Sequence, residues 1–450
     1  MFATMLKTMA AAVMAVIVTV AAVPAWSAET ATFNDTARFL AGLPPSPDSP
    51  LAPLTKDPAW QQHARYFDQI FAREDARLSK VRAFSKENLT EKHETMLYMF
   101  SGPDFLYATS FFPNASTYVM AGLEPSGDIP QLTNLSRGTV FSSLRNLESS
   151  MASLLSYSFF ITKNMKTQLH EGPVYGTIPV LYVFMARTGK TIHDVSLVGL
   201  DTDGKFINAD GSGADGADAK GDGKSDGKAD VKKVALRSIA RSAAPGVKIV
   251  FSDGNGPKQT LYYFSTNLSD GSVERSGFMA FVETLPPADA FIKSASYLLH
   301  SGGFSKVRGM LLDRSATILE DDSGIPLAYF DQKKWRLQPF GRYVGPLGIF
   351  GHSFQPGMSE LFRHATPIEF GIGYRWRHNE SNLLLAQKGA PRTSDQELTP
   401  ASPTPQDDAQ APKKTKKGSQ TRRTYKTGYM GCRYGGVFPF CSDNAHGAAR

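Results

Sequence analysis

Short runs of β-branched and aromatic residues alternate with longer segments of helical periodicity, and this alternation limits the possible fold more than any other feature of the chain. The runs predict strands over Met96–Ser101, Tyr118–Leu123, Ile178–Ala186, Val195–Leu200, Val247–Ser252, Thr260–Thr266 and Phe278–Val282. Apolar spacing and end signals predict helices over Ala59–Phe84, Phe141–Tyr157, Pro287–His300, Phe304–Leu319 and Met358–His364. Asp253-Gly254-Asn255-Gly256 is a hairpin signal. Together these features predict an α+β fold with a mixed, largely antiparallel sheet and packed helices.

Three segments have compositions that do not favour a packed core. Residues 29–58 are rich in Ala, Thr, Pro and Ser, residues 201–233 are mostly Asp, Gly, Lys, Ala and Ser, and residues 388–450 begin with a proline-interrupted stretch. We therefore predict a flexible lead-in over 29–58, a single domain over 59–387 with a disordered insertion at 201–233, and a disordered basic tail over 388–450. The alternating Asp and Gly residues of the insertion do not form an EF-hand calcium loop, because no glutamate occurs from Asp201 to Lys233.

The body of the chain contains a weak internal similarity. Leu97-Tyr98-Met99-Phe100-Ser101 resembles 261–265, and Ile178-Pro179-Val180-Leu181-Tyr182 resembles 325–329. A duplication would divide the domain into halves at 95–200 and 247–387. The alternative is chance similarity between aromatic strands.

The N-terminus has the pattern of an export signal. Lys7 precedes an apolar run from Thr8 to Val23, and Pro24 and small residues up to Ala28 follow it. The pattern predicts a cleaved signal peptide over residues 1–28 and a periplasmic or secreted location. The alternative is an uncleaved anchor, but a run of about 16 residues is short for a bilayer core of roughly 30 Å. No later apolar run is long enough to span a bilayer, so we expect no transmembrane span after cleavage.

The excess of positive charge and both cysteines lie in the tail. The chain has a formal net charge of +7, and residues Lys413 to Arg450 alone carry nine cations against one acid. The remaining chain is therefore close to neutral, which does not indicate a nucleic-acid partner. The tail could instead adhere to an anionic envelope polymer or membrane surface. The only two cysteines, Cys432 and Cys441, are spaced for a local disulfide, and they are too few for a zinc site.

Standard catalytic signatures are missing. Gly351-His352-Ser353-Phe354-Gln355 has Gln where a nucleophile elbow needs Gly, and the sequence has no phosphate loop and no zinc-protease motif. Two carboxylates beside predicted strands are the candidate catalytic residues, namely Asp104 and Asp322. If they face each other across a cleft, they could act as acid and base in glycoside cleavage. The alternative is that each caps a turn through hydrogen bonds to backbone amides.

The region from Trp335 to Arg377 is the most aromatic and basic part of the body. Arg342, Tyr343 and Trp376 are the candidate ligand-binding residues, because aromatic rings flanked by arginine can stack cyclic ligands. The alternative is that these rings belong to the core. No metal site and no cofactor are predicted.

These features favour an exported, non-catalytic binding or envelope-associated module. The alternative function is a hydrolase that acts on an envelope polysaccharide through Asp104 and Asp322. Assembly with another exported protein through the aromatic C-terminal half is a third, weaker hypothesis.

Overall fold

The computed structural model describes residues 31–91, 93–157, 172–208, 236–375 and 377–389, and the backbone of 432–434 and 439–441. The predicted signal peptide therefore lies outside the described residues, as do most of the predicted insertion and most of the tail. No helix in the described part is long and apolar enough to cross a membrane.

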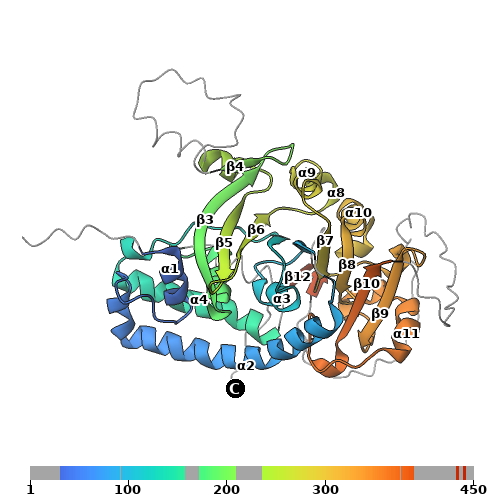
Figure 1. Cartoon of the computed structure of the whole chain (residues 1–450), viewed down its shortest axis with the longest axis horizontal. Helices are drawn as coiled ribbons and strands as arrows, with labels where there is room; N and C mark the ends of the chain where they lie inside the picture. The colour runs from blue at the N-terminus through green and yellow to red at the C-terminus, as the bar shows by residue number, and fades with distance from the viewer. Residues whose placement is uncertain are drawn as a thin grey trace, which may run out of the picture.

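Ten strands of the described chain form one mixed sheet, in the spatial order β4-β3-β5-β6-β2-β1-β7-β8-β10-β9 (Figure 1). The strands are β1 Thr95–Met99, β2 Thr117–Gly122, β3 Lys190–Leu200, β4 Phe206–Asn208, β5 Gly246–Asp253, β6 Lys258–Ser265, β7 Ala288–Ile292, β8 Ser315–Glu320, β9 Trp335–Gly341 and β10 Asn382–Lys388. The pairs at both flanks are antiparallel, and the pairs between β6 and β8 are parallel. The expected α+β fold with a mixed sheet is confirmed.

The parallel centre of the sheet has a switch in its winding direction. In chain order the five parallel strands are β1, β2, β6, β7 and β8, but in space they lie in the order β6-β2-β1-β7-β8. The chain therefore moves outward from β1 in one direction and then returns to β7 on the other side of β1. In sheets wound in this way, the carboxyl ends of the two central strands border a crevice where ligands commonly bind. We call this place, between the ends of β1 and β7, the switch point.

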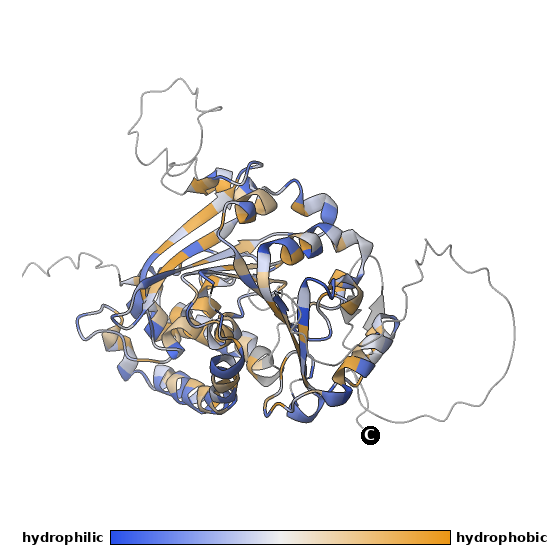
Figure 2. Cartoon of the chain, turned by 45° about the vertical axis from the view of Figure 1, so that its right-hand side comes forward, coloured by the Kyte–Doolittle hydropathy of each residue, from blue (hydrophilic) through white to orange (hydrophobic). Residues whose placement is uncertain are grey.

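Two layers of helices cover the two faces of the sheet (Figure 1). The helices of the first face are α1 Phe33–Leu40, α2 Pro58–Asn88, α3 Phe105–Phe111, α4 Arg137–Tyr157 and α6 Ile178–Arg187. Those of the second face are α8 Asp270–Val273, α9 Phe278–Glu283, α10 Ser305–Arg314 and α11 Pro356–Leu361. Side chains of β1 alternate between them, with Met96 and Tyr98 in the first core and Leu97 and Met99 in the second. The strands accordingly carry much of the apolar colouring in Figure 2.

The long helix α2 positions part of the site described below. It begins at Pro58, with the Asp57 side chain accepting a hydrogen bond from the amide of Ala59, and it ends at Asn88. Its apolar stripe buries Phe67 and Val81 completely in the core of the first face. The prediction of a helix over Ala59–Phe84 is confirmed, with a few more residues at its ends.

The segment expected to be a flexible lead-in is folded instead. Helix α1 is capped by Thr32, and Phe39 and Leu40 have no exposed surface. The His63 ring of α2 lies 2.8 Å from the carbonyl oxygen of Leu40, and Trp60 stacks on Phe39. Burial of Phe39, Leu40 and the alanines beside them is enough to dock so short a helix. The average composition of residues 29–58 does not reveal these few apolar residues. The prediction of an exposed lead-in over 29–58 is therefore wrong for the described residues 31–58.

Three secondary-structure predictions are wrong, and a fourth is correct only over its first part. Ile178–Ala186 and Phe278–Val282 were expected to be strands and are the helices α6 and α9. Pro287–His300 was expected to be a helix and contains β7, while Phe304–Leu319 divides into α10 and β8. In α6 and β7 nearly every residue is buried, so no alternation of polar and apolar positions distinguishes helix from strand.

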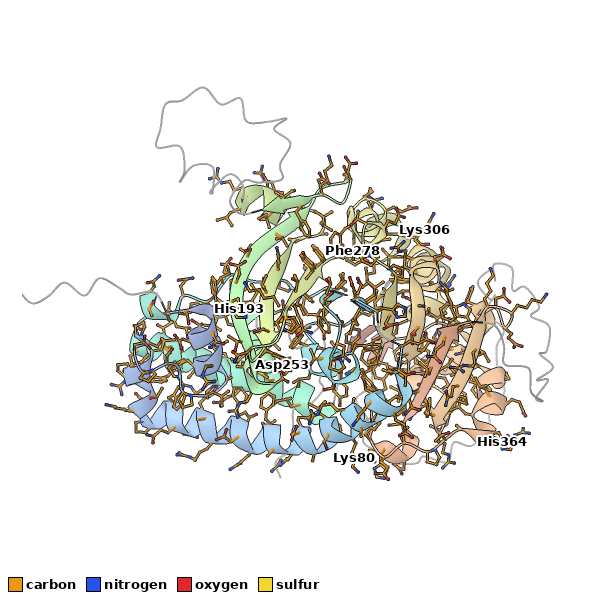
Figure 3. The ribbon with its side chains drawn as sticks, in the orientation of Figure 1. Lys80, His193, Asp253, Phe278, Lys306 and His364 are labelled. Carbon is orange, nitrogen blue, oxygen red and sulfur yellow. The ribbon has the colours of Figure 1, made fainter. Side chains whose placement is uncertain are left out.

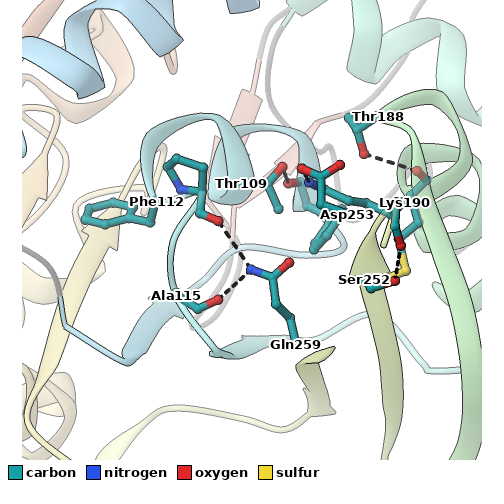
Figure 4. Close-up of polar contacts among 12 residues, drawn as sticks. Thr109, Phe112, Ala115, Thr188, Lys190, Ser252, Asp253 and Gln259 are labelled. Carbon is teal, nitrogen blue, oxygen red and sulfur yellow. Dashed lines mark hydrogen bonds and ion pairs between the residues drawn. The ribbon is translucent and has the colours of Figure 1, made fainter. Parts of the chain in front are cut away.

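The hairpin prediction is confirmed, since Asp253 ends β5 and the chain turns into the antiparallel strand β6. Figure 4 shows polar contacts on either side of it. The ammonium group of Lys190 lies 2.7 Å from a carboxylate oxygen of Asp253. Gln259 donates to the carbonyl oxygens of Pro113 and Ala115 at 3.2 and 2.7 Å, which ties β6 to the loop after α3.

Two further boundary predictions are corrected. The insertion was expected to begin at Asp201, but residues 201–208 form a turn and the edge strand β4, with the Asp201 carboxylate accepting from the amides of Asp203 and Lys205. The proposed repeat is not reflected in the structure, because 178–182 lie in helix α6 whereas 325–329 form a loop that ends in the 3-10 turn Leu327–Tyr329. The same pentapeptide pattern thus occurs in two different structures.

Candidate functional site

A buried ion pair occupies the switch point. Lys293 directly follows β7, and Asp104 follows β1 as the N-cap of α3. The Lys293 ammonium lies 2.5 Å from a carboxylate oxygen of Asp104, and the two side chains are only 2% and 3% exposed. The same oxygen accepts a hydrogen bond of 2.7 Å from the Tyr98 hydroxyl. The strand order thus brings together two charges that lie far apart in the sequence.

The charges of this pair depend on each other. Burial lowers the pKa of Lys293, and the attraction of Asp104 opposes that change. The Lys293 ammonium also lies 3.7 Å from the centre of the Tyr107 ring, a cation–π contact. Burial, and then the charge of Asp104, raise the pKa of Tyr98, so this tyrosine remains a neutral hydrogen-bond donor. The pair is therefore held on several sides by groups that keep it in place.

An acidic run, Glu320-Asp321-Asp322, ends the neighbouring strand β8, and each residue is at most 4% exposed. Asp321 accepts hydrogen bonds from the amides of Ser294 and Ser323, both at 3.0 Å. Asp322 accepts from the Tyr297 hydroxyl at 2.5 Å and from the side-chain amide of Asn382 at 3.2 Å. The run thus fixes the loop that follows Lys293.

Burial raises the pKa of all three carboxyl groups in the acidic run. For Asp321, the negative charge of Asp322 raises the pKa further. For Glu320, the hydrogen bond from the Ile325 amide opposes the rise. Ionising this run in the folded protein is therefore costly.

A pH-dependent difference in stability should follow for a Glu320→Gln variant. Because the pKa of folded Glu320 lies well above its ordinary value of 4.5, the ionised carboxylate costs stability above the folded pKa, and this cost disappears as the pH falls toward 4.5. Glutamine has no charge and can still accept from the Ile325 amide. We expect the variant to gain stability relative to the wild type at pH 8 and to lose that advantage at pH 5. Urea unfolding of both proteins at each pH measures this, and a pH-independent difference would contradict it.

The backbone is strained at the ends of both central strands. Among the described residues other than glycine, only Phe100, Ser294, Ser296 and Tyr297 have a positive φ, between 54° and 61°. Phe100 directly follows β1, and the other three follow Lys293. The Tyr374 hydroxyl donates to the carbonyl oxygen of Ser294 at 3.0 Å. Such backbone conformations cost about 1–3 kcal/mol each and concentrate at functional sites.

A cavity of about 560 Å³ lies beside this centre, between α2 and the chain after residue 368. Its lining residues are Ala76, Arg77, Lys80, Glu369, Phe370, Gly371, Arg377, His378 and Asn379. Arg77, Lys80 and Arg377 are basic, and Glu369 is the one acidic residue of this lining. Lys80, labelled in Figure 3, lies 3.3 Å from the carbonyl oxygen of Glu369.

Arg77 joins the cavity to the buried ion pair. Its guanidinium donates to the Tyr107 hydroxyl at 3.4 Å and lies 3.5 Å from the carboxylate of Glu74. The Tyr107 ring in turn contacts Lys293. Burial raises the pKa of Glu74, while the charges of Arg77 and Lys293 oppose that rise. The cavity and the switch point therefore belong to one electrostatic unit.

The structure places the two predicted catalytic carboxylates at the same edge of the sheet. Asp104 and Asp322 follow β1 and β8, and β7 with Lys293 lies between those strands. Asp104 accepts from the amide of Tyr107, as the capping alternative requires, whereas the hydrogen bonds that Asp322 accepts come from the side chains of Tyr297 and Asn382. Of the carboxylates at the end of β8, Asp321 is the one whose negative charge raises the pKa of both Lys293 and Tyr98. Catalysis by the predicted pair stays a prediction.

The three predicted ligand-binding residues are not brought together at the cavity. Arg342 is exposed, and Tyr343 is 9% exposed with its ring stacked on Phe354. Trp376 lies outside the described residues. Among the other aromatic residues of this region, Trp335, Phe340 and Phe350 are buried, which agrees with the alternative that these rings belong to the core.

The predicted disulfide falls in the part of the tail whose backbone is described at 432–434 and 439–441. Strands β11 Cys432–Tyr434 and β12 Pro439–Cys441 pair antiparallel, with Cys432 opposite Cys441. This register suits a local disulfide, which stays a prediction. In the described ranges, no group of three or more His, Cys, Asp or Glu residues is arranged to hold a metal ion.

Sequence reasoning missed Lys293, Arg77 and Asp321. Lys293 had one visible signal, because it is a lone charge in the apolar stretch Ala290–Leu299. Arg77 resembles every other cation of a charged helix, and only the packing of α2 distinguishes it. Comparison of the whole chain with known proteins matches no family model, no curated protein and no solved structure.

Proposed function

We propose that this protein is an exported binding module that holds a small organic anion in the cavity beside the switch point. The observation that carries the proposal is the charge of the lining, in which Arg77, Lys80 and Arg377 outnumber Glu369. A volume of about 560 Å³ is within the range of small-molecule sites, roughly 300–1,000 Å³. Carboxylates and phosphates are the groups that arginine recognises best.

The position of the cavity supports the same proposal. Ligands of doubly wound sheets bind outside the carboxyl ends of the strands at the switch point, and Arg77 reaches from the cavity toward that place. Phe370 adds an apolar wall and is 3% exposed. The buried Asp104–Lys293 pair lies behind Arg77 and contributes a fixed dipole rather than a free charge. We therefore assign direct ligand contact to the cavity residues and a positioning role to the ion pair.

The hydrolase alternative has less support. An acid–base pair needs one carboxyl group free to exchange a proton with the substrate, and Asp104 is engaged by both Lys293 and Tyr98. The raised pKa of Asp322 is the one feature that favours this function. Loss of polysaccharide hydrolysis in both Asp104→Asn and Asp322→Asn variants would revive it.

Binding of citrate and inorganic phosphate, measured by titration calorimetry, tests the proposed cavity. In a variant with Lys80→Gln and Arg377→Gln, we expect the Kd for citrate to rise at least tenfold, because both substituted cations line the cavity. Lys306→Gln is the matched control, since Lys306 is a similarly exposed lysine of α10 on the other face of the sheet (Figure 3).

Two results would overturn the anion site. One is the absence of binding of either anion to the wild type, and the other is equal affinity in all three proteins. Urea midpoints close to that of the wild type are required of both variants, so that a folding defect is not mistaken for lost binding.

Export is a separate part of the proposal. It rests on the pattern of residues 1–28, and the basic tail from Lys413 to Arg450 is proposed to increase retention at an anionic envelope. The mass of the mature chain, recovered outside the cytoplasm, tests the cleavage. Unchanged retention after deletion of the tail would contradict the role of the tail.

A further inference from the structure

An exposed apolar patch lies on the loops that follow β8 and β9. The large apolar side chains that the described chain exposes are Tyr329, Val344, Ile349 and Phe354, with exposed fractions of 46%, 43%, 44% and 51%. All four fall within the one segment 329–354, although large apolar side chains occur throughout the described chain. Single exposed apolar residues are ordinary, but a group of this kind marks an interaction surface. We call these four residues the loop patch.

Contacts link three of the four members of the loop patch, and Ile349 lies in the same loop, between Val344 and Phe354. The Phe354 ring is 3.5 Å from the position that a Cβ of Gly345 would take, which puts it beside Val344. The Phe354 ring also stacks on Tyr343, with centroids 6.1 Å apart. The turn that carries Tyr329 is joined to this loop by a hydrogen bond of 2.8 Å from the Leu327 amide to the Gln355 side chain.

The loop patch stands on a fixed base, and its exposure is therefore not the result of a poorly packed loop. Phe350 is 3% exposed and packs against Tyr297 and Tyr374, with ring centroids 5.0 and 6.0 Å away. The Arg375 guanidinium donates to the carbonyl oxygen of Gly345 at 2.7 Å. Phe350 and Gly345, which lie beside the exposed residues in the chain, contact residues of the site described above. These contacts fix the loop with its exposed side chains facing solvent.

The segment that carries the loop patch has more exposed basic residues than acidic ones. Between residues 326 and 364 the chain carries Lys333, Lys334, Arg336, Arg342 and Arg363 against Asp331 and Glu360, a net charge of +3. All five cations are exposed. The Arg308 guanidinium also lies 3.9 Å from the centre of the Tyr329 ring. Aromatic and aliphatic tips beside exposed cations are the combination that inserts into the headgroup region of an anionic bilayer.

We propose that the loop patch docks this protein on an anionic lipid surface, with Ile349 and Phe354 inserted among the headgroups and Arg342 paired with lipid phosphates. This contact is separate from the basic tail, which attracts the same surface by charge alone. Insertion of apolar side chains survives added salt, whereas attraction by the tail weakens with it. The chain is thereby attached to the face of a membrane and does not cross it.

Co-sedimentation of the full chain with vesicles tests this docking. We expect binding to vesicles of equal parts phosphatidylglycerol and phosphatidylcholine, and at least tenfold weaker binding to pure phosphatidylcholine. The double variant Ile349→Ser, Phe354→Ser should bind the mixed vesicles at least tenfold more weakly than the wild type, and the difference should persist at 0.5 M salt, on the order of a 4 Å Debye length. Arg342→Gln should weaken binding severalfold, while the matched control Lys306→Gln should not.

Three outcomes would overturn the proposal. They are no binding to the mixed vesicles, equal binding by the wild type and the Ile349→Ser, Phe354→Ser variant, and a concentration-dependent dimer in light scattering that the same substitutions abolish. The last outcome would assign the loop patch to a second copy of this chain. Citrate binding should be unchanged in the double variant, so failure of this proposal is distinguishable from failure of the anion site.

Discussion

Replacing Lys293 by methionine is expected to lower the free energy of unfolding by about 3–5 kcal/mol, because the substitution leaves the Asp104 carboxylate buried without its cation. Methionine has a similar length and apolar stem, so lost packing contributes little. Urea unfolding at pH 7 measures the change. No comparable loss is expected from Lys306→Gln, since the ion pair of Lys306 with Glu274 is exposed.

The double variant Lys293→Met, Asp104→Asn tests whether the lost stability comes from an unpaired buried charge or from damage to the packing. It removes both charges, and asparagine can still cap α3 and accept from the Tyr98 hydroxyl. Most of the lost stability should return, which would give a coupling energy of about 2 kcal/mol or more in a double-mutant cycle. A loss below about 1 kcal/mol for the single variant, or additive losses in the cycle, would contradict a tightly coupled buried pair.

Replacing Gly373 by alanine should be the second large effect, with a loss of about 2–4 kcal/mol. The residue has a φ of +59°, and an added Cβ would lie 2.1 Å from a carboxylate oxygen of Asp321 and 3.1 Å from the Ser294 hydroxyl. Asp321 cannot retreat easily, because it holds the amides of Ser294 and Ser323. The substitution should therefore disturb the strained loop after β7 as well as the overall stability.

Gly309→Ala is the matched control for this substitution. Gly309 lies inside helix α10, and an added Cβ would meet no atom within 4 Å. Alanine favours the helix over glycine, so this variant should gain about 0.5–1 kcal/mol. Urea unfolding of the two variants under the same conditions measures both. A Gly373→Ala variant as stable as the wild type would mean that Asp321 is not held in place as described.

Residues 371–375 connect the cavity, the loop after β7 and the loop that carries Val344. Gly371 lines the cavity, Gly373 lies against Asp321, and Tyr374 holds the carbonyl group of Ser294. Arg375 then reaches the backbone of Gly345 in the loop behind the loop patch. Residues 371–375 therefore reach from the lining of the cavity to the backbone of the loop that carries Val344.

Local patterns in the sequence were sufficient for part of this architecture. The apolar spacing of three and four residues in α2, the Asp253–Gly256 turn and the short strands β1, β2, β5 and β6 each depend on residues close together in the chain. Their prediction is confirmed. The α+β fold with a mixed sheet followed from these elements. The carboxylates Asp104 and Asp322 were also found from the sequence, because each follows a strand-like run in a turn.

Only the tertiary structure decided which groups these carboxylates contact. The apolar segments of α6 and β7 are almost completely buried, so their sequences carry no periodicity from which helix or strand could be read. With β7 unrecognised, the parallel centre of the sheet and its switch point were invisible. So was Lys293, whose partner Asp104 follows a strand that lies far earlier in the sequence. The sequence alone determined which groups could be charged, and the strand order determined which of those charges meet, because pairing in a sheet joins residues regardless of their distance along the chain.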